Sequence, residues 1–264
     1  MPDRWGIGFP MKAVELFSRF EQDIPPSYAV PGDQNGYIGT LDPHIFDVQK
    51  ILVLMDYILP ESPNIDYSLY DLLVLHHPPP ISPVIPTYVI HSNWDIVTGG
   101  ACDALADALN ITSFDVLDES TGIGRIGGID RETEDIITQG RFIHEIMATL
   151  RVHDIRTVNC NRFQPVGTIC VISGFGLTPP LISKAISKGV DIVVSGDLTH
   201  PGAVLAKNAN ITLIDATHHA TELPGLYRLG EMISSYGLDV QVRNFGIPWT
   251  RSVNRGVRRE YDNH

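Results

Sequence analysis

Short apolar runs, each about the length of one β-strand, recur along this chain. Residues 51–58 and 71–75 form such runs in the N-terminal half, and residues 166–173, 190–195 and 210–215 form them in the C-terminal half. In the C-terminal half each run is followed by a segment with the apolar spacing of a helix. Strands that alternate with helices over short connections are typical of α/β folds with parallel strand pairs. We therefore expect an α/β fold with mixed or parallel sheets flanked by helices.

The balance of charges limits the partners of the chain. Its 264 residues carry a net charge of −12, with 43% hydrophobic and 19% charged residues. This composition is that of a folded globular chain, long enough for one large domain or two small lobes. Nucleic acid binding relies on clustered lysine and arginine side chains, so the acidic charge argues against a nucleic acid as the main partner.

Three features favour a soluble, cytoplasmic protein. No apolar run approaches the length of a membrane span, so we expect no membrane insertion. The first residues lack the basic start and long apolar stretch of a secretory signal. The cysteines, Cys102, Cys160 and Cys170, are odd in number and form no C-x-x-C pair. That pattern fits a reducing compartment better than a disulfide framework.

Polar residues follow four of the expected strands directly. His76 follows Leu-Leu-Val-Leu, His91 follows Thr-Tyr-Val-Ile, Asp197 follows Ile-Val-Val-Ser-Gly, and His218 follows Thr-Leu-Ile-Asp-Ala-Thr. In α/β sheets, binding sites form outside the carboxyl ends of the strands. We therefore expect these four segments to meet at one edge.

The same segments supply a set of metal donors. Two pairs are spaced i, i+4, which places both members on one face if the segment is helical. Together the segments offer four imidazoles and two carboxylates, enough for two divalent ions that share one carboxylate; we expect Glu222 to be the shared one. Mixed imidazole and carboxylate ligands suit iron, manganese, zinc, cobalt or nickel. The donors are His76, His77, His91, Asp95, His218 and Glu222.

Each motif taken alone has an ordinary alternative. The double histidine could be two exposed loop residues, Asp95 could be a turn residue or helix cap, and the last pair could lie on an exposed helix face. His91 could be a ligand or a proton carrier. His200, beside Asp197, could orient a ligand, act as an acid or base toward a substrate, or cap a helix. His219 should point about 100° away from His218.

Two glycine motifs invite a phosphate-binding interpretation. Residues 122–127 match G-x-G-x-x-G, but we reject a dinucleotide site because residues 115–121 do not resemble a buried strand and no helix start follows. Arg125 within the motif could face an anion. Residues 173–176, Ser-Gly-Phe-Gly, lie between a strand and a helix and could offer N–H groups to phosphate, or could simply form a tight connection.

These motifs, in this order, resemble one known family. The chain is similar to the Nif-three-like family (NGG-one-interacting factor three), whose members are also called type 2 homologues of GTP cyclohydrolase I. The resemblance extends over almost the full length. It rests on residues 32–39, His76-His77-Pro78, 91–106, 122–127, 173–176, 195–200 and 215–222.

The resemblance implies a two-lobed fold with a dinuclear metal site between the lobes, and a ring-shaped homohexamer built as a trimer of dimers. One ion would bind His77, Asp95 and Glu222, and the other would bind His76, His218 and Glu222. His91 and His200 match residues that line the same cavity. The family usually has a longer segment before the second motif; here thirteen residues separate His77 from His91, so the cavity wall should differ there.

On the same resemblance we divide the chain into three parts. Residues 1–10 are an N-terminal extension, and residues 11–250 form the α/β domain. Lobe one takes about 11–121 plus 196–250, and lobe two takes about 122–195. Residues 251–264 form a basic C-terminal tail, which is either a frayed end or a weak contact arm.

We weigh two functions for such a site. The first is a metal-dependent hydrolase acting on a nucleotide or a phosphorylated small molecule, because paired ions activate water and polarise phosphoryl groups. The family name suggests GTP, although a name inherited by homology is no mechanism. The second is a metal-handling, scaffold or regulatory protein without turnover. Open metal positions facing a pocket would favour the first, and a sealed site would favour the second.

Overall fold

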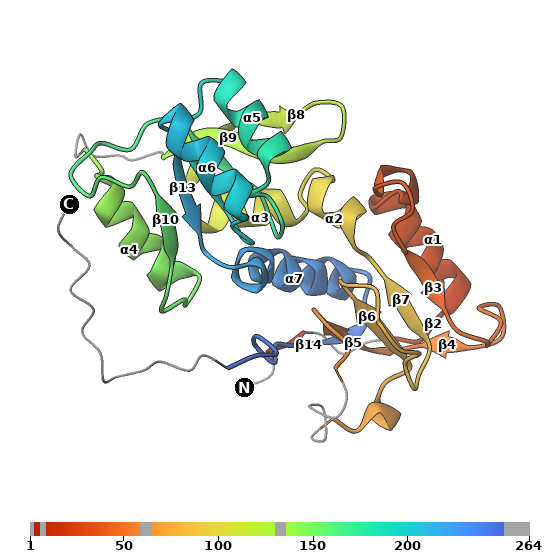
Figure 1. Ribbon diagram of the computed structural model, residues 1–264. Helices are drawn as coiled ribbons and strands as arrows, with labels where there is room; N and C mark the ends of the chain where they lie inside the picture. The colour runs from red at the N-terminus through yellow and green to blue at the C-terminus, as the bar shows by residue number, and fades with distance from the viewer. Residues whose placement is uncertain (1–2, 6–8, 59–64, 130–135, 251–264) are drawn as a thin grey trace.

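Two six-stranded sheets form the framework of the computed structural model, which describes residues 3–5, 9–58, 65–129 and 136–250. Both sheets mix parallel and antiparallel pairs, and helices flank both of them (Figure 1). The expected α/β class with mixed sheets is thus confirmed. A two-stranded ribbon and short helical turns complete the fold: β2 (Met11–Lys12), β4 (Asp47–Val48), η1 (Pro26–Tyr28) and η2 (Tyr67–Leu69).

The first sheet combines both ends of the described chain. In spatial order its strands are β1 (Asp3–Trp5), β14 (Asp239–Arg243), β5 (Lys50–Leu54), β6 (Leu72–Leu75), β7 (Thr87–Val89) and β3 (Gly36–Ile38). The four inner strands run parallel, and the two edge strands pair antiparallel. Residues 3–5, which we expected in an extension, therefore contribute an edge strand.

The second sheet contains the central part of the sequence. In spatial order its strands are β10 (Arg156–Val158), β13 (Thr212–Asp215), β12 (Ile192–Ser195), β11 (Ile169–Val171), β9 (Ile123–Ile129) and β8 (Ile111–Asp118). Only β11, β12 and β13 pair in parallel. The sheets therefore divide the chain differently from the expected lobes, because β8 and β13 both belong to this second sheet.

Strand β8 also corrects one expectation about residues 115–121. We expected no buried strand there, yet β8 extends to Asp118. This edge strand buries Leu117 and exposes Asp115, so it lacks the continuous apolar run of a central strand. A strand with one solvated face is harder to recognise from composition.

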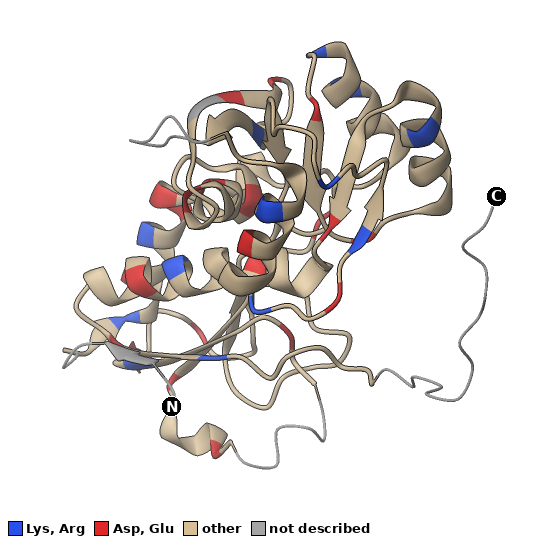
Figure 2. Ribbon diagram, turned by 90° about the vertical axis from the view of Figure 1, so that its left-hand side faces the viewer, with Lys and Arg blue, Asp and Glu red and all other residues tan. Residues whose placement is uncertain are grey.

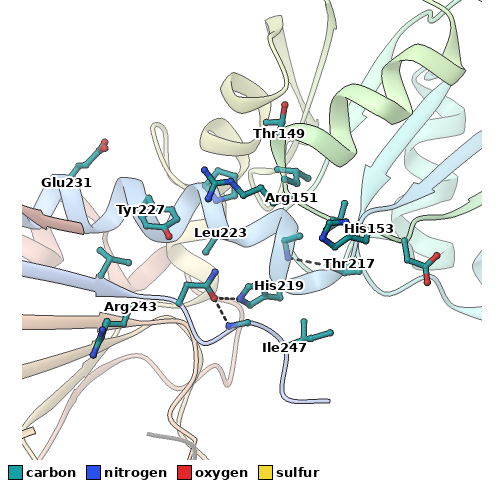
Figure 3. Close-up of a pocket in the computed structure, with 18 residues that line it drawn as sticks. Thr149, Arg151, His153, Thr217, His219, Leu223, Tyr227, Glu231, Arg243 and Ile247 are labelled. Carbon is teal, nitrogen blue, oxygen red and sulfur yellow. Dashed lines mark hydrogen bonds between the residues drawn. The ribbon is translucent and has the colours of Figure 1, made fainter. Parts of the chain in front are cut away.

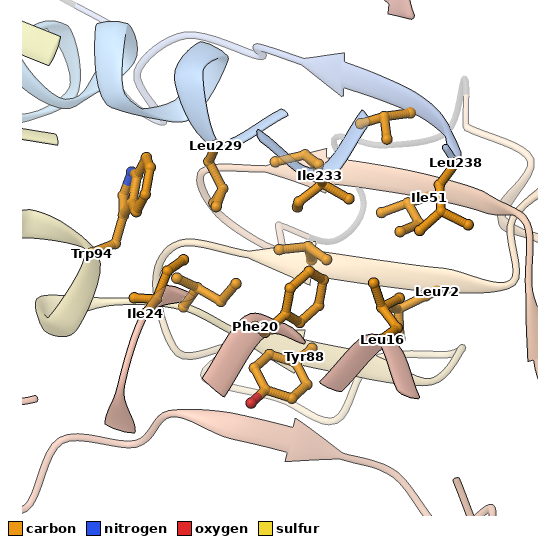
Figure 4. Close-up of a cluster of buried hydrophobic side chains, with 14 of the residues drawn as sticks. Leu16, Phe20, Ile24, Ile51, Leu72, Tyr88, Trp94, Leu229, Ile233 and Leu238 are labelled. Carbon is orange, nitrogen blue, oxygen red and sulfur yellow. The ribbon is translucent and has the colours of Figure 1, made fainter. Parts of the chain in front are cut away.

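Helices α1 (Ala13–Asp23) and α7 (His218–Ser235) contribute to the core on one face of the first sheet. Figure 4 shows the resulting core, in which Leu16 and Phe20 from α1 lie near Ile51 of β5, while Leu229 and Ile233 project from α7. All five side chains are almost fully buried. Burying such side chains stabilises the fold by roughly 1.5–3 kcal/mol each.

Helix α7 lies between the two sheets (Figure 1). It follows β13 of the second sheet, yet its C-terminal half packs in the core of the first. Helix α3 (Ala101–Ala108) approaches it so closely that a Cβ at Gly225 would lie 2.5 Å from the Cβ of Ala101. The N-cap of α3 is Gly100, which supplies no side-chain hydrogen bond to the helix.

The second sheet has helices on both faces. Helix α4 (Gln139–Thr149) packs on one side, and α5 (Pro179–Ser187) and α6 (His200–Ala209) pack in the core of the other. The remaining helix, α2 (Ser92–Ile96), is one short turn after β7. No helix in the described part of the chain is both long and apolar enough to cross a membrane. Lysine and arginine are scattered over both halves (Figure 2), and residues 251–264 lie outside the description.

Candidate metal centre

The carboxyl end of β6 presents two histidines to the space between the sheets. The backbone N–H of His76 donates to the Leu54 carbonyl at 3.0 Å, and that of His77 donates to the Met55 carbonyl at 2.9 Å, which continues the parallel ladder beyond the strand. The two ring centroids lie 4.9 Å apart. Both rings approach one carboxylate, so the pair is not a pair of exposed loop residues.

That carboxylate is Glu222, in the second turn of α7. Its side chain is only 3% exposed. Oε1 lies 2.9 Å from Nε2 of His218 and 3.5 Å from Nε2 of His76, and Oε2 lies 3.1 Å from Nε2 of His77. Glu222 is thus the centre of the donor cluster, which we define as His76, His77, Asp95, His218 and Glu222.

Asp95 joins the cluster from α2. Its Oδ1 lies 3.7 Å from Nε2 of His76. On the other side, Nε2 of His77 lies 3.3 Å from Nε2 of His218. Donor atoms that share one small cation are spaced by about this much, because each lies roughly 2.0–2.2 Å from the ion.

The outward nitrogen of every histidine in the cluster is held by the protein. Nδ1 of His76 lies 3.0 Å from the Ile90 carbonyl, and Nδ1 of His77 lies 2.8 Å from Asp56. Nδ1 of His218 lies 2.6 Å from Asp197. Such contacts fix the tautomer and turn Nε2 toward a metal.

Three buried donor atoms in the cluster have no hydrogen-bond partner among the described residues. They are Nε2 of His76, Oδ1 of Asp95 and Oε2 of Glu222. The 3.1 Å approach of Glu222 to His77 is close but lacks hydrogen-bond geometry. Unpaired buried polar atoms are costly and rare, and a divalent cation would satisfy all three. The residues therefore fit a metal. His76, His77 and Glu222 each offer one ligand atom, and these atoms all lie within 4.8 Å of one another.

Two glycines allow the neighbouring loops to reach the cluster. At Gly174, whose φ is +72°, a Cβ would lie 2.3 Å from Oε1 of Glu222. At Gly196 a Cβ would lie 2.4 Å from the backbone nitrogen of His218. The N–H groups of Gly174 and Gly176 donate to the hydroxyls of Thr221 and Ser195. Residues 173–176 therefore form a tight connection, and those two N–H groups are not offered to a phosphate.

The cluster shifts the protonation of its own members. Burial alone would raise the pKa of Glu222, but the histidines around it hold that pKa well below its ordinary value. Burial would lower the pKa of His77 and His218, but their carboxylate partners raise these pKa values to about 10 and about 9. Burial raises the pKa of Asp95 to about 7. Strongly perturbed groups in one buried cluster are typical of functional sites.

The other predicted histidines have different positions. His91 lies beside the cluster, with its ring centroid 5.4 Å from those of both His76 and His77. His200 is exposed at the first position of α6, and the side chain that caps this helix is Thr199. His219 points to the other side of α7, where its Nε2 lies 2.8 Å from Asn244 Oδ1.

A large groove lies on that other side of α7. It has a volume of about 1200 Å³ and is lined by α7, the segment after α4 and the end of β14 (Figure 3). His219, Leu223 and Tyr227 project from α7 toward it, whereas His218 and Glu222 face the cluster. The donor cluster therefore does not line this groove.

Arg125 does not face an external anion, contrary to our expectation. Its side chain is 6% exposed and pairs with Asp103. It also donates to the carbonyls of Gly122, Gly124 and Ile96 at 2.9, 3.0 and 3.0 Å. The G-x-G-x-x-G stretch enters β9 rather than a helix, which is consistent with the rejection of a dinucleotide site.

Sequence reasoning missed two residues that orient histidines, one within the cluster and one beside it. Asp56 comes just after β5 and holds His77, and Asp33, in the loop before β3, holds His91 at 2.7 Å. Asp56 follows the end of a parallel strand, so the rule that selected His76 could have found it. The signal for Asp33 is weaker, because it lies 58 residues from its partner.

Comparisons with known proteins point to one family. A family model described as Duf34/NIF3 (NGG1p interacting factor 3) matches residues 80–248, a range that begins after the double histidine. A Methanothermobacter thermautotrophicus protein named GTP cyclohydrolase 1 type 2 homolog is 45% identical over 238 residues, which cover 90% of this chain and 93% of that protein. A Methanocaldococcus jannaschii protein of the same name is 28% identical, covering 88% and 98%.

Solved structures show the same fold. The structure described as reduced HcgD from Methanocaldococcus jannaschii superposes with a TM-score of 0.74 at 26% identity, covering 91% of this chain and all of that one. A Bacillus cereus protein related to NIF3 gives a TM-score of 0.73 at 18% identity, covering 91% and 99%. The second likeness supports the fold alone.

Proposed function

This chain belongs to the Duf34/NIF3 family, and from that membership and the donor cluster we propose that it is a dinuclear metal-dependent hydrolase. The observation that carries the proposal is the set of three buried donor atoms that have no hydrogen-bond partner within the described residues. The five residues of the donor cluster would hold two divalent ions, with Glu222 bridging them. Iron, zinc, manganese, cobalt and nickel all suit this donor set.

The distances support a division of ligands that differs from the one implied by the family resemblance. His77 and His218 bring their Nε2 atoms within 3.3 Å of each other, and His76 and Asp95 lie within 3.7 Å. We therefore propose that His77 and His218 share one ion and that His76 and Asp95 share the other. The resemblance instead pairs His77 with Asp95.

The chemistry follows from this arrangement. Paired ions supply Lewis acidity toward a phosphoryl group. The chain itself would orient the ligands through Asp56 and Asp197, and would accept a proton at His91, beside the cluster but outside the ligand set. His200 is exposed and remains only a candidate for contact with the substrate. We propose a nucleotide or phosphorylated small molecule as substrate, in line with the name of the relatives.

Metal analysis and an activity screen test the hydrolase proposal. Elemental analysis of the purified protein should find two ions per chain. The metal-loaded protein should then be screened against GTP, other nucleotides and simple phosphate esters. Glu222→Gln should abolish the activity, whereas Glu231→Gln, an exposed change in the same helix, should leave it intact. Equal activity in both variants would refute a reaction at the cluster.

The alternative is a metal-handling or scaffold protein. The deep burial of His76 and Glu222, and the position of the cluster away from the large groove, favour this reading. Full metal content without turnover on any substrate class, together with transfer of the ions to a competing chelator, would support it over the hydrolase.

Assembly and location remain proposals based on family membership. We propose a homohexamer, arranged as a trimer of dimers, in the cytoplasm. Light scattering of the purified protein should give six times the chain mass of 29.1 kDa. A monomer at micromolar concentration would contradict the hexamer.

A further inference from the structure

Asp33 fixes the start of α2 from a loop far away in the sequence. Its Oδ1 lies 2.7 Å from Nδ1 of His91. Its Oδ2 accepts hydrogen bonds from the backbone N–H of Ser92, at 3.2 Å, and from the Ser92 hydroxyl. The same hydroxyl accepts from the Val30 N–H at 2.9 Å. The Asp33 side chain is 9% exposed, so this carboxylate is both buried and fully engaged.

The contact determines which nitrogen of His91 carries a proton. An ionised carboxylate only accepts hydrogen bonds, so Nδ1 of the neutral imidazole donates to Asp33 and Nε2 keeps its lone pair. His77 and His218 have the same arrangement with Asp56 and Asp197. Their Nε2 atoms approach Glu222. By contrast, the ion pair of His91 with Asp33 is made by Nδ1. Nε2 of His91 forms no ion pair with the described residues.

The His91 ring is also partly exposed to solvent, as are the rings of His77 and His218. Its plane is steeply inclined to those of His76 and His77, at 73° and 81°, and its side chain is 28% exposed, against 3% for His76. The Nε2 lone pair of His91 is therefore beside the donor cluster but outside the proposed set of metal ligands. A ligand that enters the site from solvent would meet this ring.

We propose that Asp33 is a positioning residue that fixes the tautomer and orientation of His91. In that orientation, Nε2 of His91 accepts a hydrogen bond from a proton-bearing phosphoryl or hydroxyl oxygen of a ligand at the donor cluster. The presence of that ligand at the cluster depends on the proposed function, whereas the Asp33–His91 contact is observed independently of it. The loop at residues 32–39 thereby acquires a role in the site.

Nitrogen NMR of the protein labelled with ¹⁵N-histidine tests the positioning role. In wild-type protein, with or without zinc, Nδ1 of His91 should carry the proton and Nε2 should not. Asp33→Ala should give a mixture of tautomers, and Asp33→Asn, whose amide can donate to Nδ1, should favour the opposite tautomer. Asp66→Ala is the matched control, because Asp66 accepts from the N–H and hydroxyl of Ser68 in the same way but holds no histidine.

A protonated Nε2 in the wild type, or an unchanged tautomer in both Asp33 variants, would overturn the positioning role. Failure to bind zinc would instead defeat the proposed function while the tautomer is still measured. The wild-type tautomer is informative even if a variant fails to fold.

Inorganic phosphate serves as the probe for the ligand contact. In the zinc-loaded wild type, phosphate should shift the His91 Nε2 resonance. Its affinity should fall about tenfold in His91→Ala and in Asp33→Ala at unchanged zinc content, which is the usual effect of losing one hydrogen bond. No shift in the wild type, or equal affinity in all three proteins, would overturn the contact.

Discussion

Two buried charged clusters lie near the same helices, and they differ in how completely the protein satisfies them. In the first, Arg125 pairs with Asp103 and donates to three backbone carbonyls. In the second, the donor cluster around Glu222, three buried donor atoms lack a hydrogen-bond partner in the part of the chain that the structure describes. Buried polar groups that are fully paired rigidify a fold, whereas unpaired ones are costly unless a ligand completes them. The contrast separates a structural cluster from one suited to an ion.

The largest expected effect is loss of metal when the shared carboxylate is removed. Glu222→Ala should lose both ions, because Glu222 is the residue that approaches three of the histidines. Elemental analysis of the purified variant should find close to no metal, and Glu231→Ala should keep the wild-type content. Full metal content in Glu222→Ala would refute the conclusion that the donor cluster binds the ions, and its unpaired donor atoms would then need another explanation.

The second effect concerns the satisfied cluster. Arg125→Ala should reduce the free energy of unfolding by about 3–5 kcal/mol, because the half-buried Asp103 would lose its charged partner and three carbonyls would lose their donor. Urea denaturation measures this change. The control is Arg19→Ala, which removes an exposed pair with Glu15 and should cost about 0.5 kcal/mol or less. Metal content per folded chain should stay unchanged in both variants; a loss in Arg125→Ala would show that the two clusters are not separate.

Paired substitutions sharpen the description of the donor cluster. If His77 and His218 share an ion, as their 3.3 Å separation suggests, the double change to alanine should leave about one ion per chain. If the two histidines bind different ions, the same double variant should lose both. The combination of His76→Ala with Asp95→Ala repeats the test for the other ion.

The smallest effect comes from a glycine that touches the cluster without contributing a donor. Gly174→Ala would place a Cβ 2.3 Å from Oε1 of Glu222, and we expect metal affinity to fall about 10–100-fold, as for other groups that support metal ligands. Gly189 has nearly the same φ, +70°, but open space around it. Gly189→Ala should cost about 1–2 kcal/mol of stability and leave metal affinity unchanged. Titration with zinc distinguishes the two variants.

The strand-end rule explains why much of the cluster could be anticipated from sequence. His76 and His77 follow β6 of the first sheet, whereas His218 follows β13 of the second, so the strand-end segments do not meet at one sheet edge as we expected. The rule placed each residue at the end of a parallel strand. That the two sheet edges face each other depends on how the sheets pack. The α/β class followed from the same short apolar runs. These signals are local, so they can be recognised in the sequence without knowledge of tertiary packing.

The errors arose where a residue depends on partners distant in the sequence. Arg125 looked available for an anion because three of its acceptors are backbone carbonyls. Every residue has a carbonyl, so the residue types in a sequence do not show which carbonyls will meet a side chain. Asp33 went unnoticed because its contact with His91 depends on how a turn-rich loop folds back. Strand β8 was missed because this edge strand exposes Thr112 and Asp115 and so lacks a continuous apolar run.

The path of α7 has a mechanical consequence. The helix leaves the second sheet at β13 and embeds its far half in the first, so the donors on its first two turns are anchored to one sheet and meet donors that extend from the other. A cation held by both groups would act as a crosslink between the halves of the molecule. By thermodynamic reciprocity, a change that moves the halves apart would weaken binding of the cation, and removal of the cation by a chelator would weaken the contact between the halves.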